Sequence, residues 1–359
     1  MRWTVMALLA TVCSLFIASG AGAVATPPFT VVMTGLDSPR GLAWSPEGAL
    51  YVAEAGRGGH EPCFPGPDGG PQFGGFTGGI SRLQGGVQQR VATGLPSVAA
   101  ADGTGALGPH DVAPIGGGAV RFTIGLGTNP ANRAICGSVG PKLGWTGRLS
   151  SSGSWSLETD LAAYEAAANP DGGLPDSDPY GLLPQHGSTV ATDAGGNSLV
   201  RVTGGSVSTI ATFPSRAQGR FTDSVPTTVA VGPDGAYYVG ELTGAPFVPG
   251  QARIYRVVPG QPPTIYKSHF SFIIDIAWGP GGNLYVLQFA NGPGLSGPGE
   301  LWRIAPTGAR TLVATGFIAS TSVAIGPDGA FYVSNCGVFP STGPSPCGGL
   351  GGQVVRFTG

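Results

Sequence analysis

Residues 226–241 read PTTVAVGPDGAYYVGE, and this stretch decides the fold because its pattern returns along the chain. Val, Thr and Tyr favour strands on both sides of the GPDG tetrapeptide at 232–235. Proline presets φ at an early turn position, and glycine tolerates positive φ at a late one. The stretch therefore predicts a β-hairpin.

Five further copies of the hairpin occur. They are PRGLAWSPEGALYVAE (39–54), PHDVAPIGGGAVRFTI (109–124), PYGLLPQHGSTVATD (179–193), IIDIAWGPGGNLYVLQ (273–288) and STSVAIGPDGAFYVSN (320–335). Aligned on one apolar residue of the first strand, the copies are 70, 70, 47, 47 and 47 residues apart, at Leu42, Val112, Leu182, Val229, Ile276 and Val323. Hairpins repeating at this period predict an all-β, six-bladed β-propeller of four-stranded antiparallel blades.

A third strand follows each hairpin and carries one arginine between apolar residues, at Arg82, Arg148, Arg201, Arg256, Arg303 and Arg356. We interpret these arginines as a shared structural device of the outer blade; the alternative is a ring of anion binders. A fourth strand follows in the first five repeats, whereas the chain ends after the third strand of the sixth. Residues 29–36 (FTVVMTGL) precede the first hairpin as a fourth strand would, so we expect them to complete the last blade and close the ring, which removes the exposed sheet edge.

The first 25 residues have the pattern of a secretory signal peptide. Arg2 precedes a short apolar run, and small residues follow up to Ala25. We expect an exported chain with one propeller domain over 26–359, secreted or periplasmic; an uncleaved anchor is the alternative. No second apolar run follows, so we expect no membrane insertion after cleavage.

The charge of the chain gives no reason to expect a nucleic-acid partner. Its net charge is −2 and only 11% of its residues are charged, so a basic surface is not indicated. The 64 glycines and 33 prolines fall at turns between apolar strands, where they punctuate a packed β protein. We expect a monomer.

Four cysteines follow the predicted signal peptide: Cys63, Cys136, Cys336 and Cys347. An even count in an exported chain favours disulfides. Three pairings are possible, and we choose Cys336 with Cys347 in one blade and Cys63 with Cys136 in neighbouring blades. A zinc site is the alternative, but no Cys-x-x-Cys spacing supports it.

The early repeats carry long insertions, which we expect to be loops. They cover 55–78, 125–144 and 161–178, and the last contains DLAAYEAAANP (160–170), which predicts a short helix. Most insertions join the second strand to the third, so they share one rim of the ring with the starts of the first strands. Loops gathered on one face of a rigid scaffold commonly carry binding sites.

The repeat alignment places polar residues at one end of the central channel. Candidate metal ligands at the ends of second strands are Glu54, Asp193, Glu241 and Asn335. Candidate ligand-binding residues at the channel mouth are Arg40, His110, Asp111, Tyr180, Asp275 and Gln288. Carboxylates and amides suit a hard divalent cation such as Ca²⁺ or Mg²⁺; the alternative is that these groups bind main-chain groups and channel water.

Long stretches of the chain resemble the ScyD/ScyE family of exported propellers. The resemblance rests on SPRGLAWSPEGALYVAEAGRGG (38–59), GPHDV (108–112), IGLGTNP (124–130), DLAAYEAAANPDG (160–172), DAGGNSLVRV (193–202) and VPTTVAVGPDGAYYVGELTGAPF (225–247). It implies a six-bladed propeller outside the cytoplasm, related in layout to NHL-repeat and gluconolactonase-type proteins, and it implies no reaction. Asp178 departs from the asparagine expected before Pro179, which weakens a ligand role for this position.

Two functions follow as hypotheses. The first is a secreted binding or scaffold protein that holds a small molecule, glycan or protein at the channel mouth and loop-rich face. The second is a metal-dependent, lactonase-like hydrolase with the four metal-ligand candidates above and His110 or Asp275 as base. No nucleophile elbow, zinc-protease motif, P-loop or dinucleotide fingerprint is present.

Overall fold

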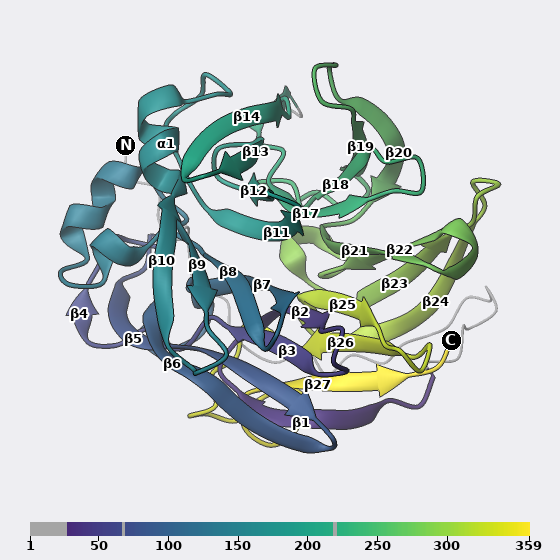
Figure 1. Ribbon diagram of the computed structural model, residues 1–359, viewed down its shortest axis with the longest axis horizontal. Helices are drawn as coiled ribbons and strands as arrows, with labels where there is room; N and C mark the ends of the chain where they lie inside the picture. The colour runs from purple at the N-terminus through teal and green to yellow at the C-terminus, as the bar shows by residue number, and fades with distance from the viewer. Residues whose placement is uncertain (1–26, 67–68, 218–220) are drawn as a thin grey trace.

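The computed structural model describes residues 27–66, 69–217 and 221–359. The predicted signal peptide lies outside these residues. Six antiparallel sheets stand around a central axis, with their first strands innermost (Figure 1). The predicted six-bladed β-propeller is confirmed.

Blades 1 to 5 each have four main strands in chain order from the inside outward, and blade 1 has one further short strand. Blade 1 has β2 (Pro39–Trp44), β3 (Leu50–Glu54), β5 (Gln72–Gln84) and β6 (Val87–Ala100), with β4 (Glu61–Pro62) paired to β5. Blade 2 has β7 (Pro109–Gly116), β8 (Ala119–Ile124), β9 (Trp145–Leu149) and β10 (Trp155–Asp160). Blade 3 has β11 (Pro179–Gln185), β12 (Ser188–Asp193), β13 (Ser198–Thr203) and β14 (Ser206–Thr212).

The later blades follow the same plan. Blade 4 has β17 (Pro226–Val231), β18 (Tyr237–Glu241), β19 (Ala252–Val257) and β20 (Thr264–Phe270). Blade 5 has β21 (Ile273–Gly279), β22 (Asn283–Gln288), β23 (Gly299–Ile304) and β24 (Arg310–Phe317). A small hairpin, β15 (Arg216–Ala217) and β16 (Phe221–Thr222), lies between blades 3 and 4 in the chain.

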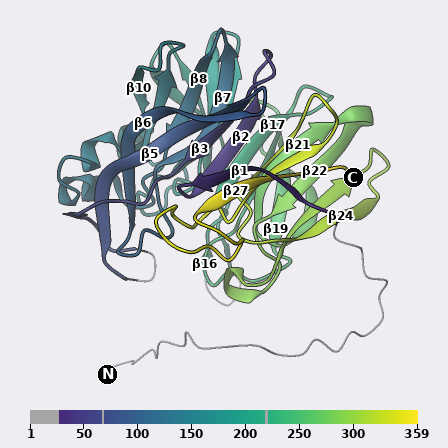
Figure 2. The ribbon, with the colours of Figure 1, turned by 90° about the horizontal axis from the view of Figure 1, so that it is seen from below.

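Blade 6 combines the two ends of the chain. It contains β25 (Ser322–Ile325), β26 (Phe331–Asn335), β27 (Gly352–Phe357) and, outermost, β1 (Thr30–Leu36), which pairs antiparallel with β27 (Figure 2). Met33 and Leu36 of β1 are buried, and the ring of Phe29 stacks on Phe317 at 4.9 Å. The predicted closure by the N-terminal strand is confirmed.

The hydrophobic core lies between neighbouring blades. One cluster, for example, packs Val190 and Leu199 of blade 3 against Val229 and Val239 of blade 4. The inward alternation of each strand supplies one side of such a layer, and the next blade supplies the other. Every blade therefore depends on both of its neighbours.

Insertions hold the helices. The predicted helix is α1 (Leu161–Ala168), and the carboxylate of Asp160 caps it by accepting the N–H of Ala163. The described residues also form the 3₁₀ turns η1 (Pro130–Ile135), η2 (Gly140–Lys142) and η4 (Pro293–Leu295) in insertions, and η3 (Pro280–Gly282) in the hairpin turn of blade 5. The insertion 55–78, expected to be a loop, is one only in part, since β5 begins at Gln72 and pairs with β6 to form a long ribbon. No helix of the described residues is long and apolar enough to cross a membrane.

Both predicted disulfides are confirmed. Cys63 is joined to Cys136, which ties blade 1 to blade 2, and Cys336 is joined to Cys347 within blade 6. Two disulfides are typical of proteins outside the reducing cytoplasm.

Three of the third-strand arginines, Arg201, Arg256 and Arg356, make contacts that fit the interpretation as a structural device. Arg256 and Arg356 bind Asp234 and Asp328 in the hairpin turns of their own blades, while Arg201 donates to the hydroxyl of Tyr237 in the next blade. The glycine after each of these aspartates has φ of 76°. This left-handed conformation explains why the GPDG turn ends in glycine.

Candidate functional site

A cavity of about 160 Å³ lies where the first strands begin. Five of the six blades contribute to its wall, so it sits at the axis. The lining residues are Arg40, Leu107, His110, Asp178, Tyr180, Ala194, Val225, Thr227, Leu242, Ile274, Phe289 and Leu295. Of the predicted channel-mouth residues, Arg40, His110 and Tyr180 line this channel-mouth cavity.

One side of the cavity is polar. Arg40, 8% exposed, donates from one guanidinium nitrogen to the carbonyl of Ala106 at 2.6 Å, while its Nε has no hydrogen-bond partner. The ring of His110 packs on that of Tyr180 with centroids 4.6 Å apart. Its Nδ1 lies 3.3 Å from the carbonyl oxygen of Pro179 and 3.5 Å from Oδ1 of Asp178.

Gly125 makes room for the histidine. A Cβ at this position would lie 2.1 Å from a ring carbon of His110 and 2.4 Å from the carboxylate of Asp178. Any side chain here would displace one of the two groups. Gly125 directly follows β8, so the sequence that ends this strand also shapes the cavity.

Burial sets the charge of the polar side. Burial and the nearby Arg40 guanidinium lower the pKa of His110 to about 3, so the imidazole is neutral at ordinary pH. Burial, followed by the charge of Asp193, raises the pKa of Asp178 well above its usual value, although Arg40 opposes that shift. Burial raises the pKa of Tyr180 to about 12. Arg40 therefore supplies the positive charge of the cavity.

The opposite wall is apolar. Its residues are Leu107, Ala194 and, from blades 4 and 5 and their loops, Val225, Leu242, Ile274, Phe289 and Leu295, with Thr227 as a polar member. A cavity with one buried cation and an apolar wall suits a ligand that is part acceptor and part hydrocarbon.

Asp111 and Asp275 were predicted to face the ligand, but both hold blades together. Asp111 accepts the N–H of Leu182 from blade 3 at 2.7 Å. Asp275 accepts the N–H of Val323 from blade 6 at 2.9 Å and the hydroxyl of Thr228 from blade 4 at 2.8 Å. Burial raises the pKa of both carboxyls, and for Asp111 the charge of Asp275 is the second cause.

These contacts belong to a wider belt around the channel. Asp111 and Asp275 each stand one residue before the aligned apolar residue of their first strand. Thr228 and Ser322 occupy the same position in blades 4 and 6. The hydroxyl of Thr228 accepts the N–H of Ile276 in blade 5, and that of Ser322 accepts the N–H of Leu42 in blade 1. Blades 1 and 3 have Gly41 and Gly181 there instead. A Cβ at Gly41 would lie 2.1 Å from Oδ1 of Asp111, so the glycine admits the carboxylate of the following blade.

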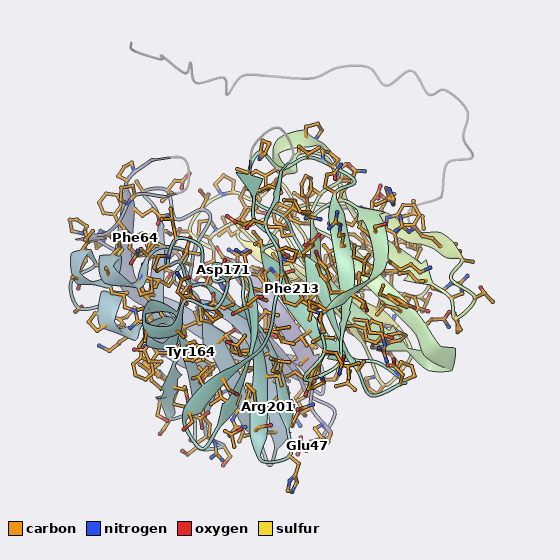
Figure 3. The ribbon with its side chains drawn as sticks, turned by 90° about the horizontal axis from the view of Figure 1, so that it is seen from above. Glu47, Phe64, Tyr164, Asp171, Arg201 and Phe213 are labelled. Atoms are coloured by element: carbon orange, nitrogen blue, oxygen red, sulfur yellow. A yellow bond between two sulfur atoms is a disulfide. The ribbon has the colours of Figure 1, made fainter. Side chains whose placement is uncertain are left out.

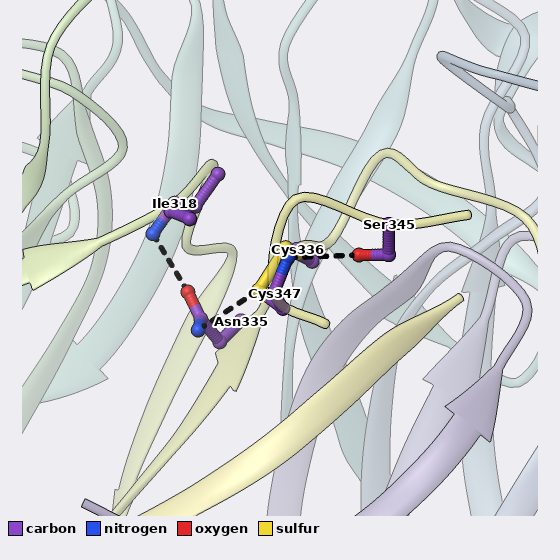
Figure 4. Close-up of a disulfide and its surroundings, with 5 residues drawn as sticks. All are labelled: Ile318, Asn335, Cys336, Ser345 and Cys347. Carbon is purple, nitrogen blue, oxygen red and sulfur yellow. Dashed lines mark hydrogen bonds between the residues drawn. A yellow bond between two sulfur atoms is a disulfide. The ribbon is translucent and has the colours of Figure 1, made fainter. Parts of the chain in front are cut away.

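The residues that end the second strands serve their own blades. Asn335 accepts the N–H of Ile318 at 2.7 Å, next to the Cys336–Cys347 disulfide (Figure 4). In the same way Gln288 accepts the N–H of Ser271 at 2.8 Å, and Asp193 accepts that of Asp178 at 2.6 Å. Each side chain thus fastens the segment that leads into the first strand.

The two buried glutamates at this position have charged partners as well. Glu54 accepts the N–H of Asp37 at 2.8 Å and is paired with Arg90. Glu241 accepts the hydroxyl of Ser224 at 2.5 Å and lies 2.7 Å from a guanidinium nitrogen of Arg216. In the described part of the chain, no three His, Cys, Asp or Glu side chains are arranged to hold a metal ion. The structure therefore does not gather Glu54, Asp193, Glu241 and Asn335 into one coordination sphere.

Sequence reasoning missed two parts of the cavity. The aspartate in place of the expected asparagine weakens a ligand role for Asp178 in the sequence, yet the side chain lies 3.5 Å from His110. Ala194, Leu242 and Phe289 each follow directly after a second strand, so the repeat alignment carried one residue further would have indicated them.

The ring and its channel-mouth cavity define a six-bladed β-propeller with a cavity at the axis. No family model matches the chain, and no curated protein matches its sequence. Solved propellers do resemble its fold. The PQQ-bound form of aldose sugar dehydrogenase from Streptomyces coelicolor shares 14% identity with a TM-score of 0.54, covering 92% of this chain and 99% of that one.

Two further solved structures are similar. A candidate glucose dehydrogenase from Thermus thermophilus shares 18% identity with a TM-score of 0.52, covering 92% of this chain and 99% of that one. A luciferin-regenerating enzyme shares 14% identity with a TM-score of 0.50, covering 93% of this chain and 95% of that one. At these identities the likeness establishes the fold alone.

Proposed function

We propose that this chain is an exported binding protein of the ScyD/ScyE type that holds a small molecule in its channel-mouth cavity. The observation that carries the proposal is Arg40: its guanidinium is buried, lines the cavity and leaves Nε without a partner. An unpaired buried donor costs free energy, and a ligand acceptor would remove that cost. The cavity therefore favours a ligand with a carboxylate or carbonyl group.

The volume of the cavity and its apolar wall limit the class of ligand that it can hold. Pockets for drug-sized ligands are usually about 300–1,000 Å³, and this cavity is about 160 Å³. It would accept a compact molecule or the end of a longer one. Phe289 and Leu295 would contact the hydrocarbon part while Arg40 binds the acceptor.

The experiment is a thermal-shift and NMR titration with benzoate, phenylacetate and hexanoate, each beside its amide. We expect an acid to raise the Tm more than its amide does. Arg40→Gln should abolish the difference, and Arg82→Gln, on the outer blade, should retain it. Equal responses from acid and amide, or an undiminished response in Arg40→Gln, would contradict a carboxylate site at Arg40.

One observation favours a second function, hydrolysis of the lactonase type. His110 lines the cavity with Asp178 beside it, the pairing of imidazole and carboxyl that general-base catalysis uses, but its pKa of about 3 makes it a weak base at neutral pH. Turnover of δ-gluconolactone that disappears in His110→Gln, while ligand binding persists, would support catalysis. Equal turnover by both proteins would dismiss His110 as the base.

A further inference from the structure

A short loop of blade 5 borders the channel-mouth cavity. Residues 289–298, which we call the blade 5 insertion, join β22 to β23. Connections of this kind lie on the rim opposite the hairpin turns: in Figure 3, Phe64 marks such a connection of blade 1 at one rim, and Glu47 marks a hairpin turn at the other. Two residues of the blade 5 insertion, Phe289 and Leu295, line the cavity.

Leu295 is turned inward at the tip of this insertion. Its neighbours Pro293, Gly294 and Ser296 are exposed, whereas Leu295 is half-buried and lines the cavity. Because the loop on both sides of Leu295 meets solvent, this leucine forms part of the wall between the cavity and the solvent.

Hydrogen bonds hold the tip in this position. The N–H of Gly292 donates to the carbonyl of Ser296 at 2.7 Å, and the hydroxyl of Ser296 donates to the carbonyl of Pro293 at 2.7 Å. The N–H of Gly294 donates to the carbonyl of Phe247 in the insertion of blade 4 at 3.1 Å. The tip is thus a small closed turn that is fastened to the neighbouring blade.

The main chain of Leu295 is strained. Its φ is 65°, in the left-handed region that a Cβ disfavours. Val225, also in the cavity wall, has a φ of 55°. The residues at the same place before other first strands are left-handed too, at Ser38, Phe272 and Ala319, so the conformation of Val225 belongs to the repeat. Leu295 lies outside the repeated hairpin, and its strain is local to the insertion.

Glycine at position 295 would be free of this strain. The blade 5 insertion already contains Gly292, Gly294 and Gly297, and glycine adopts a left-handed φ without a penalty from a Cβ. Leucine at 295 therefore keeps an apolar side chain at the cavity in spite of its backbone. Strain of this kind clusters at ligand-binding sites.

We propose that Leu295 closes the hydrocarbon end of the ligand site and so limits the length of the ligand. This inference rests on the proposed function, in which Arg40 of blade 1 binds the acceptor group of the ligand. The hydrocarbon part then lies along the apolar wall, where Leu295 of blade 5 stands. The ligand class is a carboxylate with a short alkyl chain or a single ring, because a longer chain would meet the side chain of Leu295.

The first test titrates the full chain with linear carboxylates from butanoate to decanoate, followed by NMR. The natural chain should bind hexanoate more tightly than decanoate. Leu295→Gly should bind decanoate about tenfold more tightly than the natural chain does, because the added methylenes gain an apolar space. Its affinity for hexanoate should stay close to that of the natural chain. Arg40→Gln in the Leu295→Gly background should abolish the binding of both acids.

The second test needs no carboxylate, so it separates this inference from the proposed function. Diethyl pyrocarbonate acylates neutral imidazoles, and His110 is 1% exposed, lines the same cavity and is neutral at pH 7. In Leu295→Gly, His110 should react about tenfold faster relative to the exposed His186, because the wall no longer has to open first. Mass spectrometry of the digested protein measures both rates.

Leu174→Gly is the matched control, since Leu174 is 91% exposed in another insertion, and it should behave like the natural chain in both tests. Leu295→Ala keeps the disfavoured backbone and should melt below Leu295→Gly. Should Leu295→Gly not fold, Leu295→Ala replaces it in both tests.

The outcomes distinguish the two proposals. If hexanoate binds but decanoate binds Leu295→Gly no better than the natural chain, the role of Leu295 is overturned. An unchanged rate of His110 modification would overturn it as well. If no carboxylate binds any of the proteins, the proposed function fails, and faster modification of His110 would still support Leu295 as the residue that closes the cavity.

Discussion

The carboxylate of Asp275 in blade 5 accepts the N–H of Val323 in blade 6 at 2.9 Å, across the blade interface. The same carboxylate accepts three more hydrogen bonds, from the N–H of Ile276 and from the hydroxyls of Thr228 and Ser322. One side chain thus joins blades 4, 5 and 6 at the channel. A propeller has no single core, so such contacts complement the apolar layers between its blades.

Asp275→Asn should destabilise the ring. All four partners of Asp275 are donors, and an amide would place its NH₂ against two of them and leave a buried N–H without an acceptor. We expect a loss of about 2–4 kcal/mol in the free energy of unfolding, measured with urea. Asp102→Asn, on an exposed turn where one carboxylate oxygen accepts the N–H and the hydroxyl of Thr104, should change it by about 1 kcal/mol or less. Equal losses for the two variants would show that the hydrogen bonds of Asp275 between the blades do not contribute to stability.

His110 should make the free energy of unfolding decrease at acidic pH. Its pKa is about 3 in the folded chain and 6.5 in the reference state, so the unfolded chain binds more protons between these values. Stability should therefore fall as the pH drops from 6.5 toward 3. His110→Gln removes this term, and its profile should gain about 2–4 kcal/mol over that of the natural chain between pH 6.5 and 4. Parallel profiles in urea titrations would mean that His110 is protonated in the folded state.

Packing of the closing strand β1 should contribute several kcal/mol to the free energy of unfolding. Met33 on β1 is 1% exposed and packs in the cluster between blades 6 and 1. Met33→Ala should cost about 2–5 kcal/mol by urea unfolding, because it leaves a cavity at the closure. Val31→Ala, at a position 45% exposed on the same strand, should cost about 0.5 kcal/mol or less. A small effect of Met33→Ala would show that blade 6 does not need its outer strand.

Substitution of Glu54 tests whether this residue has a structural or a metal-binding role. Glu54→Gln removes the charge that pairs a buried carboxylate with the partly exposed Arg90, and should cost about 1–3 kcal/mol after screening by solvent. The metal content of the purified protein, measured by mass spectrometry, should stay unchanged. Loss of a stoichiometric metal at unchanged stability would restore Glu54 as a metal ligand.

Most of the architecture could be predicted because every blade repeats the same local chemistry. The turn between the first two strands, the apolar alternation and the third-strand arginine recur at matching positions along the chain, so one copy explains the others. The unpaired strand 29–36 matched the one missing strand, which predicted the closure. The cysteine pairing followed from placing Cys63 and Cys136 in equivalent loops of neighbouring blades.

The candidate site could be predicted only in part. Arg40, His110 and Tyr180 begin first strands, so their common rim followed from the repeat. The roles of the acidic residues could not be predicted in the same way, because a position on the rim does not determine the direction in which the side chain points. Asp111 turns toward the next blade, Glu54 turns back to its own entering segment, and Asp178 reaches the cavity.

The sequence by itself determined the number of blades, their closure and the cross-links, because these depend on periodic hydrogen bonding and burial along each strand. Only the tertiary structure decided which polar groups meet, because the direction in which each rim side chain turns depends on the packing of its neighbours. The Nε of Arg40 lacks a partner as a result of that packing. No local pattern encodes such an absence, and the proposed ligand site rests on it.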